Sequence, residues 1–186
     1  MKTSILAILV LVMSSNTWGM PAQVILIRHG EKPATGNDLN DQGYQRAALL
    51  PKFFSSTPSV EQFGPPVAIF AMNPGASDGS NRAVETVTPL AQSLGLTLQG
   101  NYTKDDVSPL VNDIENNSSY DGHMVLICWE HKVIPLIAAA FGLQNGPTDW
   151  DGSDVFDRAW ILTFDGKSVA SFQDIPQHLL PGDSTQ

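Results

Sequence analysis

Three strongly apolar runs divide the chain, and two of them end in charged residues. They are QVILIRH (23–29), PVAIFAM (66–72) and HMVLICWEH (123–131). Apolar runs without polar alternation are typical of strands that are covered on both faces of a sheet. The pattern therefore predicts three buried strands at the centre of one sheet.

Apolar residues at helical spacing mark the segments between and after these runs. In 81–95 they fall on one stripe. In 39–56, Asn40 or Asp41 can cap the N-terminus, whereas Pro51 predicts a kink or a break. We expect helices at 39–56, 81–95, 107–118 and 132–142.

The remaining pattern completes an α/β arrangement. Residues 96–101 read as a short edge strand, and 157–164 and 168–173 as a hairpin around the turn 165–167. Strands alternating with helices predict a three-layer sandwich, in which helices cover both faces of a mostly parallel central sheet. Such sheets bind ligands at the carboxyl ends of their strands.

Cationic side chains gather at those strand ends. Arg28 and His29 end the first apolar run, His131 ends the third, and Arg82 opens the helix that follows the second. The chain as a whole has a formal net charge of −9, which argues against non-specific binding to nucleic acid or anionic membranes. A cationic cluster in an acidic chain predicts a specific anionic ligand, and Gly30 lets the backbone approach it closely.

The residue types favour a phosphoryl group over other anions. Arginines can hold phosphoryl oxygens bidentately, and a neutral imidazole can attack phosphorus. No second cysteine accompanies Cys128, and no histidine pair has zinc-site spacing, so we expect neither a metal nor another cofactor. Cys128 itself lies in an apolar run and is expected to be buried and inert.

Three blocks resemble the histidine phosphatase superfamily, which has the phosphoglycerate mutase-like fold. They are IRHGE (27–31), SNRAVETVTPLA (80–91) and VLICWEHKVI (125–134). The family pattern is a strand ending in Arg-His-Gly, a helix opened by Arg-Ala-x-x-Thr, and a strand ending in a second His. The resemblance covers nearly all of 20–186 and implies a single domain.

The resemblance also implies roles for the matching residues. His29 would be the phosphorylated nucleophile. Arg28 and Arg82 would clamp the phosphoryl oxygens together with Gly30, and His131 would donate to the phosphoryl group and hold the transition state. The chain would then be a phosphoric monoester hydrolase that needs no metal.

The general acid departs from the family pattern. Many members supply a Glu or Asp from a loop after the second Arg block, or an Asp directly after the second His, and Lys132 stands at the latter position in this chain. Glu130 precedes that His and is the first candidate, although strand alternation would send it to the opposite face. The other candidates are Glu31, Asp105 and Asp106, and a good leaving group would need no dedicated acid.

The N-terminal residues resemble an export signal. Lys2 supplies a positive start, 5–13 is an apolar stretch too short to cross a bilayer, and cleavage is expected after Gly19. The mature protein would be periplasmic or secreted, with no membrane attachment. Its partner would be a small phosphate ester or a phosphorylated protein. The alternative function is an inactive module that binds phosphate or another anion on the same fold.

Two C-terminal segments carry weaker expectations. Residues 150–157 combine aspartates with aromatic residues and are expected to form a solvated loop before a strand. The tail from Pro176 has no apolar periodicity and is expected to be frayed.

Overall fold

The computed structural model describes residues 19–75 and 79–185, so the predicted export signal at 1–19 lies outside the described residues except for Gly19. The elements are β1 (Gln23–Arg28), α1 (Asp41–Phe54), α2 (Pro58–Glu61), β2 (Pro66–Ala71), α4 (Arg82–Leu94), α5 (Val107–Asn116), the 3-10 turn η1 (Ser118–Tyr120), β3 (Met124–Trp129), α6 (Ile134–Ala140), β4 (Arg158–Asp165) and β5 (Ser168–Pro176).

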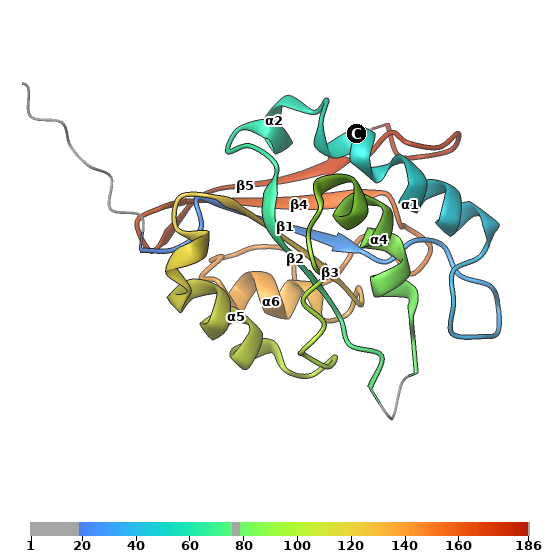
Figure 1. The fold of residues 1–186 in the computed structure, drawn as a ribbon, viewed down its shortest axis with the longest axis horizontal. Coiled ribbons are helices and arrows are strands. Elements are labelled where there is room, and N and C mark those ends of the chain that lie inside the picture. The colour runs from blue at the N-terminus through green and yellow to red at the C-terminus, as the bar shows by residue number, and fades with distance from the viewer. Residues whose placement is uncertain (1–18, 76–78, 186) are drawn as a thin grey trace, which may run out of the picture.

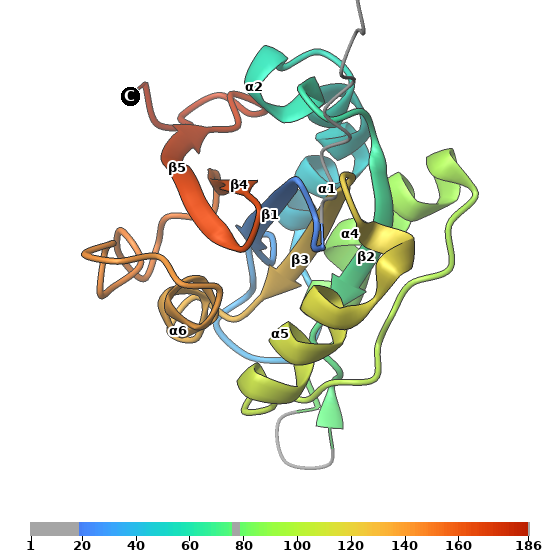
Figure 2. The same cartoon turned by 90° about the vertical axis from the view of Figure 1, so that its left-hand side faces the viewer.

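Figure 1 shows the whole fold, and Figure 2 shows the strand order β2-β3-β1-β4-β5 from right to left. β1 and β2 both run parallel to β3, β4 is antiparallel to β1, and β5 is antiparallel to β4. Only β4 therefore runs against the other strands, which confirms a mostly parallel sheet. The predicted hairpin forms its β4–β5 edge.

Helices cover both faces of the sheet. α1 packs against α4, and α5 packs against α6, and the two pairs lie on opposite sides in Figures 1 and 2. Every residue of β1 and β3 is buried, because these strands have helices on both faces and a strand on either side. Cys128 of β3 is fully buried, and burial raises the pKa of its thiol.

Two local predictions need correction. Of the kink or break expected at Pro51, the break does not occur: α1 continues to Phe54, where Phe53 and Phe54 are held in the core. The edge strand expected at 96–101 is reduced to one bridge between Gln99 and Phe70 of β2.

The cap expected at the start of α1 is present. The side chain of Asn40 accepts a hydrogen bond from the backbone N–H of Gly43 at 2.9 Å. The expected stop of α4 is also present, with Gly95 in the left-handed conformation at φ 66°. Among the described helices, none combines the length and apolar character that a membrane span requires.

Candidate active site

The candidate site lies where β1 and β3 end side by side. Arg28 and Trp129 are register partners at the ends of the two strands, and the backbone N–H of His29 donates to the carbonyl of Trp129 at 3.2 Å. The residues just beyond both strands therefore emerge together. This brings His29 beside Glu130 and His131, as the strand-end pattern predicted.

His29 is held as a neutral imidazole. Its ring is buried, and Nδ1 lies 2.7 Å from the carbonyl oxygen of Gly30, which can only accept a hydrogen bond. Burial lowers the pKa of His29 to about 4, and the nearby Arg28, Arg82 and His131 lower it as well. The hydrogen bond to the Gly30 carbonyl acts to raise it. Nδ1 therefore carries the proton at neutral pH, and Nε2 keeps a free lone pair.

Arg28 is a buried cation with unused donors. Its Nη1 donates to the carbonyls of Ser153 and Val155 at 2.7 and 2.9 Å, and its guanidinium lies 3.8 Å from the ring centre of Phe156. Nε and Nη2 are buried and have no hydrogen-bond partner in the described part of the chain. Burial lowers the pKa of Arg28 to about 10, so it stays charged at neutral pH. Buried donors without partners suit an anionic ligand.

Arg82 is the first residue of α4 and is half-buried. Its Nε donates to the carbonyl of Asp38 at 3.3 Å, and its Nη2 donates to the carbonyl of Gly36. One turn later, Thr86 accepts the backbone N–H of Gly30 at 2.8 Å and donates to the carbonyl of Arg82. The start of α4 is therefore tied directly to the turn that carries His29.

His131 and Glu130 follow β3 and contact each other. Nδ1 of His131 lies 2.9 Å from Oε1 of Glu130, at ion-pair distance but without the alignment of a hydrogen bond. Burial and the charge of Arg28 lower the pKa of His131 below its ordinary value, although the carboxylate of Glu130 acts to raise it. Strand alternation predicted that the two side chains would diverge. They do not, because β3 ends at Trp129 and the chain turns there.

The other candidate acids lie in different surroundings. Glu31 is buried in an ion pair with Arg46, at 2.6 Å. Asp106 accepts hydrogen bonds from the backbone N–H and hydroxyl of Thr103, which lower its pKa. Asp105 is exposed on the same loop. Of the four candidates, Glu130 is the one in direct contact with another predicted site residue.

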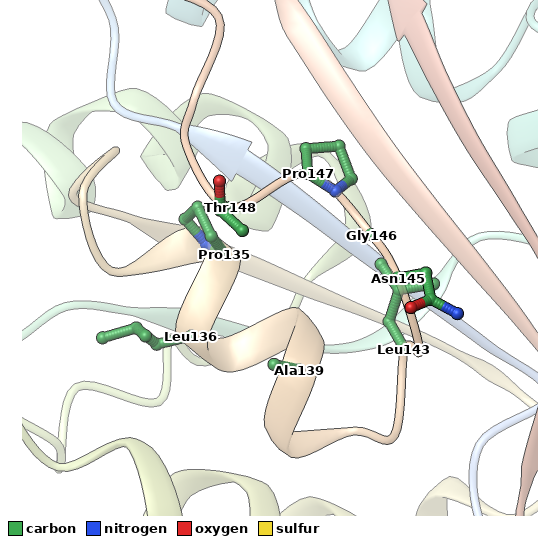
Figure 3. A pocket seen from close by; sticks show the side chains of 8 residues that line it. All are labelled: Pro135, Leu136, Ala139, Leu143, Asn145, Gly146, Pro147 and Thr148. Atoms are coloured by element: carbon green, nitrogen blue, oxygen red, sulfur yellow. The ribbon is translucent and has the colours of Figure 1, made fainter.

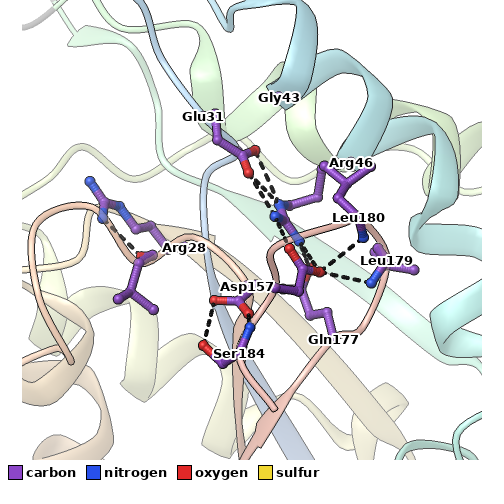
Figure 4. A network of polar contacts seen from close by, with 12 residues as sticks. Arg28, Glu31, Gly43, Arg46, Asp157, Gln177, Leu179, Leu180 and Ser184 are labelled. Carbon is purple, nitrogen blue, oxygen red and sulfur yellow. Dashed lines mark hydrogen bonds and ion pairs between the residues drawn. The ribbon is translucent and has the colours of Figure 1, made fainter.

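Two C-terminal segments support the site. The loop before β4 is exposed at 151–154, as expected, and its backbone carbonyls at Ser153 and Val155 also hold Arg28. The tail is not frayed, because Asp183 accepts from Arg46 and from the backbone N–H groups of Leu179 and Leu180, and Ser184 donates to Asp157 (Figure 4).

A cavity elsewhere in the fold has a different chemistry. Figure 3 shows a cavity between α6 and the loop that follows it. It is lined by Pro135, Leu136, Ala139, Leu143, Asn145, Gly146, Pro147 and Thr148. No charged or titratable side chain is among them, so this cavity does not suit a phosphate. Within 19–75 and 79–185, no cluster of three or more His, Cys, Asp or Glu side chains could hold a metal ion.

No protein-family model matches the chain, and no curated protein does. Solved structures do. The protein histidine phosphatase SixA complexed with tungstate shares 16% identity at a TM-score of 0.59, covering 83% of this chain and 97% of that one. The chain has the histidine phosphatase fold.

Two further structures support the assignment of the fold. A phosphoglycerate mutase from Plasmodium falciparum is 18% identical at a TM-score of 0.53, over 88% of this chain and 96% of that one. A mycobacterial glucosyl-3-phosphoglycerate phosphatase is 14% identical at 0.51, over 83% and 97%. The similarity confirms the phosphoglycerate mutase-like fold that the three sequence blocks predicted.

Proposed function

We propose that the protein is a phosphatase that hydrolyses phosphate monoesters through a phosphohistidine on His29, without a metal ion. The observation that carries the proposal is that His29 and Arg28 lie next to each other at the end of β1 with complementary chemistry. One is a neutral imidazole with a free Nε2, and the other is a buried guanidinium with two unused donor atoms. A nucleophile beside an oxyanion clamp is what phosphoryl transfer requires.

The reaction would proceed in two displacements. Nε2 of His29 attacks phosphorus, a P–N bond forms, and the P–O bond to the leaving group breaks. The leaving oxygen takes up a proton from solvent. Water then attacks the phosphohistidine, the P–N bond breaks, the water gives up a proton to solvent, and inorganic phosphate and free His29 remain. Arg28, Arg82 and His131 stabilise the charge on the phosphoryl oxygens in both steps.

Features of the fold and of its neighbours support this class of reaction. Two of the similar structures are phosphatases by name, and one of these holds tungstate, an oxyanion like phosphate. In the described residues, the longest connection between named elements is 141–157, and its backbone carbonyls hold Arg28. We therefore propose a small phosphate ester or a phosphorylated protein as substrate. The composition of 1–19 supports export to a periplasm or to the medium.

The test is release of phosphate from an aryl phosphate by the protein from residue 20 onward, with a chelator present. His29→Ala should abolish turnover, because it removes the attacking nitrogen. His123→Ala is the matched control, since His123 is exposed just before β3. Acid quenching during turnover should trap an acid-labile phosphate on His29, detected by mass spectrometry of the peptide.

The outcomes separate the two candidate functions. Chelator-resistant turnover that depends on His29, with a trapped phosphohistidine, supports the phosphatase. Binding of inorganic phosphate without any turnover would instead favour the inactive anion-binding module. Turnover that the chelator abolishes would contradict the metal-free mechanism.

A further inference from the structure

The contact between Glu130 and His131 assigns Glu130 a role other than that of general acid. We propose that Glu130 is a positioning residue that favours the imidazolium form of His131 when a phosphoryl group is bound, so that Nε2–H of His131 can donate to a phosphoryl oxygen. This inference rests on the proposed function of the site.

Both carboxylate oxygens of Glu130 already face N–H groups of the protein. Oε1 lies 2.9 Å from Nδ1 of His131, and Oε2 accepts the backbone N–H of Lys132 at 3.2 Å. An ionised carboxylate suits both contacts, since a protonated carboxyl would place a hydrogen on one of these two oxygens. A general acid must instead be protonated and must face the leaving oxygen.

The backbone of Glu130 also fixes its position. Its carbonyl accepts the backbone N–H groups of Val133 and Ile134, at 3.0 and 3.2 Å, at the start of α6. The residue thus belongs to the turn from β3 into α6. The side chain cannot swing toward a substrate without releasing the contacts of both oxygens.

The position of Nδ1 explains why His131 would need its charge. Nδ1 is buried, and the carboxylate of Glu130 is its one close acceptor in the part of the chain described. A neutral ring with its proton on Nδ1 has only a lone pair on Nε2, which would repel a phosphoryl oxygen. Only the imidazolium can face Glu130 through Nδ1–H and donate to the substrate through Nε2–H at the same time.

The other charges around His131 act against that imidazolium. Arg28 at the end of β1, Lys32 in the loop after it, and Lys132 before α6 are all cationic. Glu130 is the group that opposes them. Removing its charge should therefore favour the neutral ring, which carries only one of the two protons and cannot donate from both nitrogens at once.

Glu130→Gln separates charge from shape, because the amide is nearly the same size and can still accept from Lys132. Glu115→Gln is the matched control, the same substitution on α5. We expect E130Q to lower the pH at which His131 titrates in NMR spectra by about one unit or more, as loss of a neighbouring opposite charge does. E115Q should leave the titration unchanged.

The kinetic test distinguishes positioning from acid catalysis. In E130Q the alkaline limb of kcat/KM should move to lower pH, because His131 loses its proton earlier. At a fixed pH on that limb, turnover of an aryl and of an alkyl phosphate should fall by the same factor. A general acid would predict a much larger loss for the alkyl phosphate, whose leaving oxygen is more basic.

Each result has one meaning. A shifted titration of His131, with equal losses for both esters, supports the inference. An unchanged titration of His131, or a loss confined to the alkyl ester, overturns it. The NMR titration needs no substrate, so it tests Glu130 even if the wild-type protein shows no turnover, which would count against the proposed function instead.

Discussion

Arg46→Met tests whether the buried charges behind the site stabilise the fold. Arg46 is 2% exposed and lies on α1. Its Nη2 donates to Glu31 at 2.6 Å and to Asp183 at 2.7 Å, and it thereby joins the turn after β1 to the C-terminal tail (Figure 4). Methionine keeps an unbranched side chain of similar reach but removes the charge.

The magnitude follows from what the substitution leaves behind. Glu31 and Asp183 have side chains that are 9% and 5% exposed, so Arg46→Met leaves two carboxylates with little water to replace their partner. Removing one partner of a buried ion pair costs about 3–5 kcal/mol. In a domain of this size that lowers the melting temperature by roughly 6–20 °C.

The loss should depend on pH. Burial alone would raise the pKa of Asp183, but hydrogen bonds from Arg46 and from the N–H groups of Leu180 and Leu179 lower it below its ordinary value. A group with a depressed native pKa stabilises the fold above its unfolded pKa, and this stabilisation is lost as pH falls through the native pKa. The difference in free energy of unfolding between wild type and R46M should therefore be largest near pH 7 and should become smaller below about pH 4.

The assay is urea unfolding followed by circular dichroism at pH 7 and at about pH 3. Lys52→Met is the control, because Lys52 is an exposed cation on the same helix and should cost less than about 0.5 kcal/mol. A loss below about 1 kcal/mol for R46M at pH 7 would refute the reasoning. An equal loss at both pH values would refute the electrostatic origin.

Three further predictions concern the packing around the site. Gly43→Ala should lower the free energy of unfolding by about 1–3 kcal/mol and reduce kcat/KM, because a Cβ would overlap the backbone of Glu31. An unchanged melting temperature and unchanged kinetics would contradict this. Thr86→Val should cost about 1–3 kcal/mol in urea unfolding, because Gly30 loses the acceptor of its buried N–H, and Thr86→Ser should restore most of it. Cys128 should react with an aromatic disulfide reagent only after unfolding, since burial raises the pKa of its thiol; rapid labelling of the native protein would disprove that.

The centre of the fold and the site could be predicted because both depend on residue type. Apolar runs locate β1, β2 and β3, and the charged residues at the ends of β1 and β3 meet because parallel strands end at one edge. The register of Arg28 with Trp129 then places His29 and Glu130 beside each other. Strand periodicity failed beyond Trp129, where the strand itself stops, and at 96–101, where one bridge forms in place of an edge strand.

The C-terminal support could not be predicted in the same way. Asp183 in the tail pairs with Arg46, and the two are 137 positions apart. The local composition of the tail does not indicate that Asp183 pairs with a residue so distant in sequence. Polar residues without periodicity resemble a frayed end until the buried arginine that they satisfy is known.

The hold on Arg28 shows a more general reason why some contacts escape sequence reasoning. Its Nη1 is bound by the main-chain carbonyls of Ser153 and Val155, and every residue type carries such a carbonyl. The loop therefore holds Arg28 through the course of its backbone, and the identity of its side chains gives little indication of this role. The arginine itself is the indication in the sequence. A guanidinium at the end of a fully buried strand needs hydrogen-bond acceptors. If all three of its nitrogens bound the ligand, no protein group would hold the side chain in place. Part of Arg28 had to be held by the protein so that Nε and Nη2 could face an anion.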